Sequence, residues 1–117
     1  KNVIIENNQC RKSILAGGVD GMVIRGNTVT GRIVGNGNTN LVIHSNIVTA
    51  VSKKHAVVQL GYTKGLNFRG NIIHGANDTT VGLYLWGNTL KAANLLRQKR
   101  TEGLDSDIEQ ATAIKQE

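Results

Sequence analysis

Five short stretches of the first ninety residues carry apolar residues at every second position, in the order apolar, any, apolar, any, small, and every stretch leads directly into an asparagine. The stretches span residues 3–7, 22–26, 41–45, 66–70 and 83–87, and the asparagines that follow them are Asn8, Asn27, Asn46, Asn71 and Asn88. Alternation over so short a span is the period of a strand with one buried face. Because these asparagines are 19, 19, 25 and 17 residues apart, the pattern predicts a solenoid with one such strand in each coil.

Two more apolar positions recur at fixed distances from this strand. One lies two residues after the asparagine, at Cys10, Val29, Val48, Ile73 and Leu90. The other lies eight residues before the strand, at Ile14, Ile33 and Val58. Each position predicts a further short strand with an inward side chain, so the repeat predicts three strands per coil.

A coil of about nineteen residues with three short strands and an asparagine at one corner resembles the right-handed parallel β-helix of the pectate-lyase-like superfamily. The resemblance covers residues 1 to about 90 and implies an all-β fold, a right-handed single-stranded parallel β-helix of about four to five coils. It also implies that the corner asparagines point inward and form a ladder of side-chain hydrogen bonds between coils. If Asn27, Asn46 and Asn71 are buried in this way, Asn46→Ala should destabilise the fold by roughly 1 to 3 kcal/mol.

Two coils depart from the period of nineteen. The third carries six extra residues within residues 49–56, and the fourth is two residues short. Insertions in solenoids form loops on one face, which is often the binding face. The basic loop at Ser52, Lys53, Lys54 and His55 is therefore a candidate contact loop, and the alternative is a solvated loop with no role.

The pattern changes after Leu90. Residues 92–100 are predicted to form a helix that stops at Gly103, and the capping-box pattern from Ser106 to Glu109 predicts a second helix. We therefore divide the chain into β-helix coils at 1–90 and a short C-terminal helical segment at 91–117, which either caps the last coil or begins a coiled coil. Because the sequence starts within repeat material at Lys1, we expect further coils or a partner to cover the first coil.

Composition and charge agree with a solenoid that has a basic surface. Among the 117 residues there are fourteen Gly, no Pro and one cysteine, Cys10, which is expected to be a core thiol. Residues 1–90 hold nine Lys or Arg against three Asp or Glu, whereas residues 91–117 hold five of each. Such a basic coil surface suits an anionic polysaccharide, a nucleic acid or a lipopolysaccharide.

The coils contain little that could catalyse a reaction. Glycoside hydrolysis usually needs two carboxyl groups about 5 to 9.5 Å apart, but Glu6, Asp20 and Asp78 belong to different coils. No acidic cluster for calcium is present, and the three histidines lack metal-ligand spacing. We therefore predict no catalytic residue, no metal and no cofactor here.

Outward positions of the alternating strand form two columns. The apolar column of Ile4, Val23 and Val42 predicts a covering element or an oligomer contact. Further along the chain, the same two columns hold polar and aromatic residues on one outward face. These residues are His44, Asn67, Arg69, Tyr84 and Trp86. Aromatic rings beside planar donors suit a sugar, so these five residues are a candidate carbohydrate site. The alternative is that Tyr84 and Trp86 pack against the C-terminal segment or another subunit.

Within the superfamily, the basic coils, the apolar column and the C-terminal segment most resemble tailspike-type proteins of phages and prophages. The resemblance implies a non-catalytic part of a tailspike or surface adhesin, located in a virion tail or outside the cell. It implies binding of cell-surface polysaccharide or lipopolysaccharide and assembly as a homotrimer, with no nucleic acid and no membrane insertion. Two alternatives stay open. One is a fragment of a secreted carbohydrate-active enzyme (polysaccharide lyase, glycosidase or epimerase) whose catalytic coils precede Lys1, and the other is a purely structural virion or surface protein.

Overall fold

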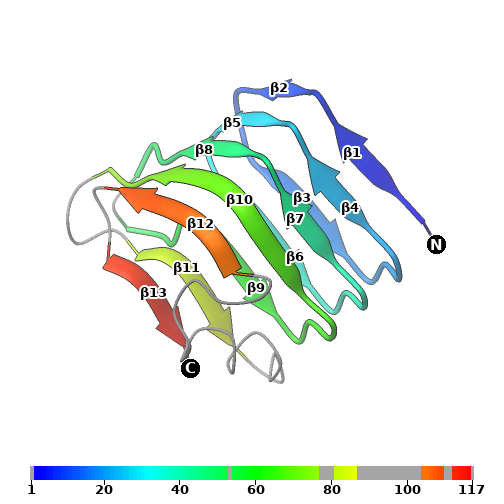
Figure 1. Cartoon of the computed structure of the whole chain (residues 1–117). Coiled ribbons are helices and arrows are strands. Elements are labelled where there is room, and N and C mark those ends of the chain that lie inside the picture. Colours follow the sequence, from blue (N-terminus) through cyan, green and yellow to red (C-terminus); the bar gives the residue numbers. More distant parts are fainter. Residues whose placement is uncertain (1, 53, 77–80, 87–103, 110–111, 117) are drawn as a thin grey trace.

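The computed structural model describes residues 2–52, 54–76, 81–86, 104–109 and 112–116, and this part of the chain is all-β, with parallel strands in two sheets and no helix. The first sheet (Figure 1) holds β1 (Ile4–Glu6), β2 (Gln9–Cys10), β4 (Val23–Arg25), β5 (Thr28–Thr30), β7 (Val42–His44), β8 (Ile47–Thr49), β10 (Asn67–His74) and β12 (Leu104–Glu109). The second sheet holds β3 (Ile14–Gly17), β6 (Ile33–Asn36), β9 (Val58–Gly61), β11 (Val81–Trp86) and β13 (Thr112–Gln116).

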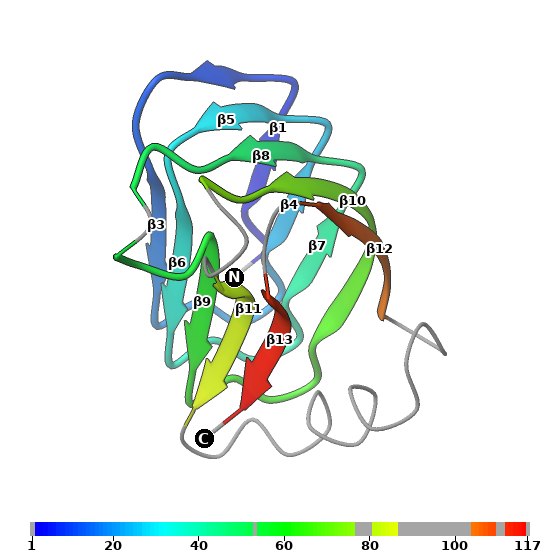
Figure 2. The ribbon, with the colours of Figure 1, turned by 90° about the vertical axis from the view of Figure 1, so that its left-hand side faces the viewer.

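Successive repeats of the chain lie against one another. β4 pairs with β1 on one side and with β7 on the other, so that Val23 lies opposite both Ile4 and Val42. In the same way β5 lies between β2 and β8, and β6 lies between β3 and β9. Parallel neighbours need a crossover connection, which the other strands and corners of each repeat supply. Figure 2 shows these repeats arranged around a common interior.

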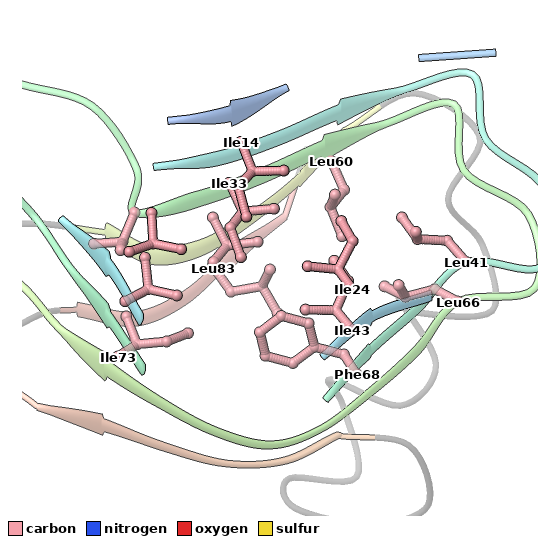
Figure 3. Packing of buried hydrophobic residues seen from close by; sticks show 14 of the residues in the cluster. Ile14, Ile24, Ile33, Leu41, Ile43, Leu60, Leu66, Phe68, Ile73 and Leu83 are labelled. Carbon is pink, nitrogen blue, oxygen red and sulfur yellow. The ribbon is translucent and has the colours of Figure 1, made fainter. Parts of the chain in front are cut away.

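Inward side chains form buried columns between the two sheets. Ile24, Ile43 and Phe68 are in register on the first sheet, and all three are fully buried. The matching column of the second sheet contains Ile33, Val58 and Leu83. Figure 3 shows that side chains from both columns meet in the interior. Burying each such side chain contributes about 1.5 to 3 kcal/mol relative to leaving it exposed, so these columns hold the repeats together.

Asparagines form the ladder that the repeat predicts at the corner between the two arms of the first sheet. Asn27, Asn46 and Asn71 are buried. The backbone N and Nδ2 of Asn27 both donate to Oδ1 of Asn46 at 3.0 Å, and those of Asn46 both donate to Oδ1 of Asn71 at 3.0 Å. Asn8 continues the ladder at its exposed end, where its Nδ2 donates to Oδ1 of Asn27 at 3.1 Å. Asn88 lies outside the described residues.

The expected place of residues 83–87 in the repeat is wrong. Leu83 pairs with Val58 of β9, in the second sheet, whereas the strand that follows β10 in the first sheet is β12. Apolar alternation looks the same in both sheets, so the pattern alone cannot assign a strand to one of them. The prediction that the fourth repeat is two residues short is also wrong. Leu83 of β11 follows His74 of β10 by nine residues, and in the third repeat Val58 of β9 follows Thr49 of β8 by the same number.

The prediction of a second C-terminal helix is also wrong, because residues 104–109 and 112–116 are strands. β12 pairs with β10, and β13 pairs with β11. The capping-box pattern at Ser106 is a local signal, whereas the edges of β10 and β11 present backbone N–H and C=O groups that a parallel strand satisfies. The helix expected over 92–100 lies outside the described residues, and the boundary at residue 90 stays a prediction.

Candidate functional site

The outward face of β4, β7 and β10 brings together three residues of the expected carbohydrate site. Arg25 is in register with His44, which is in register with Arg69, and neighbouring strands are about 4.8 Å apart. Two residues earlier on the same strands, a second column contains Val23, Val42 and Asn67. Residues i and i+2 of a strand share a face. We call these six residues the β4–β7–β10 face.

An ion pair lies at one end of this face. Oε2 of Glu6 lies 2.7 Å from Nε and 2.7 Å from Nη2 of Arg25. An exposed pair of this kind contributes about 0 to 1 kcal/mol, but it directs Arg25 toward Glu6 and offsets its charge. Among the described side chains, no ion pair of Arg69 is found, and the residue in register with Arg69 on the neighbouring strand β12 is Asp105.

His44 lies between two guanidinium groups. Partial burial lowers the pKa of His44, and the nearby charges of Arg69 and Arg25 lower it further. The ring is therefore mostly neutral at pH 7, and its Nδ1 lies 3.0 Å from Oγ of Ser45. A neutral imidazole offers one donor and one acceptor. An anion bound nearby would favour its charged form.

Asn67 presents an acceptor that the described protein does not use. Its side chain is half-buried, and Oδ1 is a buried atom without a hydrogen-bond partner among the described residues. A buried acceptor left unpaired costs about 1 to 3 kcal/mol, and such an atom in a native fold requires an explanation. A donor on a bound molecule, such as a hydroxyl group, would satisfy it.

The aromatic half of the expected site lies on the other sheet. Tyr84 is half-buried on β11, in register with Gln59, and Trp86 is in register with Gly61. The residue in register beside Arg69 is Asp105. The expected grouping of Tyr84 and Trp86 with Asn67 and Arg69 is therefore wrong, for the same reason that the strand itself was assigned to the wrong sheet.

The apolar column expected at an oligomer contact is partly accessible. Ile4 is 54% exposed, and Val23 and Val42 are half-buried. Exposed apolar side chains also occur elsewhere, because Leu15 is 74% exposed on the second sheet and Ile47 is 42% exposed on β8. Exposed apolar area alone therefore does not single out this column, and oligomerisation through it stays a prediction.

The two acidic residues of the first three repeats are already bonded. Glu6 pairs with Arg25, and Oδ1 of Asp20 accepts from Nδ2 of Asn40 at 3.2 Å, while Asp78 lies outside the described residues. Within the described part of the chain, no group of three His, Cys, Asp or Glu could hold a metal ion. None of the elements described there is a helix long and apolar enough to cross a bilayer. Cys10 is half-buried and packs against the core.

Sequence reasoning missed two features of the structure. Asn38 is buried at another corner, where its Oδ1 accepts from the backbone N of Val19 at 3.0 Å and its Nδ2 donates to the oxygen of Ala16 at 3.3 Å. The residue in the preceding repeat is Val19 rather than asparagine, so the corner gave no repeated motif. The second feature is Arg32, whose guanidinium binds the long corner between β8 and β9.

Comparison with known proteins identifies no relative of this chain. No protein-family model, no curated protein and no solved structure matches it. The residues of the β4–β7–β10 face and their geometry are therefore the basis on which a function can be assigned.

Proposed function

We propose that this chain is part of a right-handed parallel β-helix that binds an acidic cell-surface polysaccharide without cleaving it. The parallel register between repeats and the asparagine ladder support the fold. The proposal includes the resemblance to tailspike-type proteins and surface adhesins, and with it a place in a virion tail or outside the cell. The basic charge of residues 1–90 favours an acidic partner over a neutral one.

The observation that carries this proposal is the unpaired acceptor of Asn67 beside the cationic guanidinium of Arg69 and the imidazole of His44. Arg69 lies two residues after Asn67 on the same face, and His44 is in register with Arg69. A sugar hydroxyl can donate to Oδ1 of Asn67, and a sugar carboxylate matches the guanidinium fork of Arg69. Val42, in register with Asn67, offers an apolar contact to the C–H groups of the ring. An acidic sugar presents all three kinds of group.

The same face cannot hold a polysaccharide and a second subunit at once. Val23 and Val42 alternate with Arg25 and His44 on the same strands, so a contact over the apolar column would also bury the charged column. Burying a charge without a partner is strongly unfavourable, and Glu6 and Asp20 already have partners. We therefore assign this face to the ligand, and a homotrimer would use another face.

A glycan array of acidic and neutral polysaccharides tests the proposal. We expect the native chain to bind acidic glycans, Arg69→Gln to lose the signal, and Lys64→Gln to keep it. Lys64 is a matched control because it is exposed and lies at another corner, in register with Thr39. The proposal is wrong if no acidic glycan binds, a result that would favour the purely structural role, or if both variants lose the same signal.

A further inference from the structure

A long corner connects β8 to β9. Ile33 follows Thr30 by three residues, whereas Val58 follows Thr49 by nine, although both pairs are in register. Six extra residues are therefore inserted at this point of the third repeat. Figure 2 shows that the segment between β8 and β9 projects outward from the neighbouring corners.

Arg32 connects this corner to the repeats beside it. Its Nε donates to the oxygen of Ala56 at 2.8 Å, and its Nη2 donates to Oε1 of Gln59 at 2.7 Å. Its backbone N donates to Oγ of Ser13 at 3.2 Å. Three consecutive repeats thus meet at Arg32, and the two guanidinium bonds fix the orientation of the group.

This guanidinium is partly withdrawn from water and has no counterion among the described side chains. Partial burial lowers the pKa of Arg32. A guanidinium group has five N–H donors, and the bonds to Ala56 and Gln59 leave further donors for another molecule. A partly desolvated cation without a carboxylate partner favours binding of an anion.

Other basic residues lie at the same corner. The backbone of Lys12 packs against Gly31, because a Cβ added to Gly31 would lie 2.8 Å from the carbonyl carbon of Lys12. Lys54 and His55 immediately precede Ala56, whose oxygen Arg32 binds. The side chains of all three basic residues are exposed.

We propose that the corner formed by Lys12, Arg32, Lys54 and His55 binds an oxyanion, the carboxylate or phosphate group of an anionic ligand. Arg32 supplies a pre-oriented donor edge, and the two lysines add charge that adapts to the oxygen atoms. The site uses none of the residues of the β4–β7–β10 face and lies on a different side of the molecule, as Figure 2 shows for β7 and the β8–β9 connection. It therefore stands independently of the proposed function.

Nuclear magnetic resonance of the full chain tests this site directly. The Nε–H group of Arg32 is hydrogen-bonded, which gives a resonance that can be followed during titration with inorganic phosphate and, separately, with glucuronate. We expect a saturable shift with at least one probe, and the probe that responds identifies the group. Lys12→Gln and Lys54→Gln should each weaken the apparent affinity about threefold, whereas Lys64→Gln should not change it.

Two results would overturn the proposal. One is the absence of a saturable shift of the Arg32 resonance with either probe. The other is an equal loss of affinity in Lys64→Gln, which would show general attraction to a basic protein only. Because Lys12, Lys54 and Lys64 are all exposed, these variants should fold, and the unchanged remainder of each spectrum verifies this.

Discussion

Asn46 and Asn67 are the same residue type on neighbouring repeats, and the side-chain oxygens of both are shielded from solvent, but their surroundings differ. Oδ1 of Asn46 accepts from two nitrogens of Asn27, and its Nδ2 donates to the oxygens of Ile24 and His44 and to Oδ1 of Asn71. Oδ1 of Asn67 has no partner among the described residues. A fully bonded asparagine stabilises the fold, whereas the unpaired oxygen of Asn67 contributes no such bond and is the atom that we propose a ligand uses, so mutations in the two regions should have separable effects.

The largest expected effect is the loss of stability in Asn46→Ala. The substitution leaves the backbone N of Asn27 and the oxygen of Ile24 without these bonds in a buried region, and each unpaired group costs about 1 to 3 kcal/mol. We therefore expect the free energy of unfolding to fall by about 2 to 5 kcal/mol, measured by urea denaturation.

Asn8→Ala is the matched control within the ladder. Asn8 is exposed and donates through its backbone N and Nδ2 to Asn27, and its backbone N remains after substitution. We expect a loss below about 1 kcal/mol. Equal losses in the two variants would contradict the account in which burial gives the ladder its stabilising effect.

Substitutions of Arg69 should reduce binding and leave stability nearly unchanged. For a uronic acid tetrasaccharide, we expect Arg69→Gln to weaken binding about tenfold or more, because a hydrogen bond to a charged group is lost. Arg69→Lys should recover only part of this loss, since lysine keeps the charge but lacks the planar fork. Calorimetric titration provides the affinities, and full recovery with lysine would show that shape recognition is absent.

Val42→Glu distinguishes the ligand from an oligomer contact on the same face. A carboxylate beside Asn67 should repel an acidic sugar and weaken binding severalfold, with no change of oligomeric state. Light scattering and calorimetry on the same sample measure both quantities. Dissociation of an oligomer in this variant, or in Val23→Glu, would instead assign the face to a subunit contact.

The smallest expected effect is that of His44, whose protonation should make the affinity for the acidic sugar depend on pH. The pKa of free His44 lies below its ordinary value because of partial burial and the two flanking arginines, and a carboxylate bound beside them would raise it. Binding is then coupled to proton uptake, so affinity should increase as the pH falls below about 6.5. His44→Gln should abolish this increase. An unchanged slope in the variant would exclude His44 as its source.

The sequence predicts those parts of the fold in which a residue type repeats. Asn27, Asn46 and Asn71 have a constant corner role, and the inward columns consist of apolar residues at each level, so both could be placed by period alone. The assignment of Leu83 failed because inward alternation is shared by both sheets. The strands over 104–109 and 112–116 could not be predicted, because they depend on pairing with distant edges rather than on local propensity.

The candidate site was only half predictable for a related reason. Asn67, Arg69 and His44 were placed together by their register with the repeat, and this register is present in the structure. Tyr84 was placed with them through the wrong strand assignment. The unpaired state of Asn67 and the bonds of Arg32 depend on side-chain positions in three dimensions, and no spacing along the chain encodes them.

The most direct test is one paired measurement on Asn67→Ala, with affinity for the uronic acid tetrasaccharide measured by calorimetry and stability by urea denaturation. Because Oδ1 of Asn67 has no partner in the described protein, its removal should leave the free energy of unfolding unchanged or slightly raised. Loss of a hydrogen bond from the ligand should weaken binding about fivefold. A clear loss of stability with unchanged affinity would contradict the account, because Asn67 would then serve the fold and the β4–β7–β10 face would not bind the sugar.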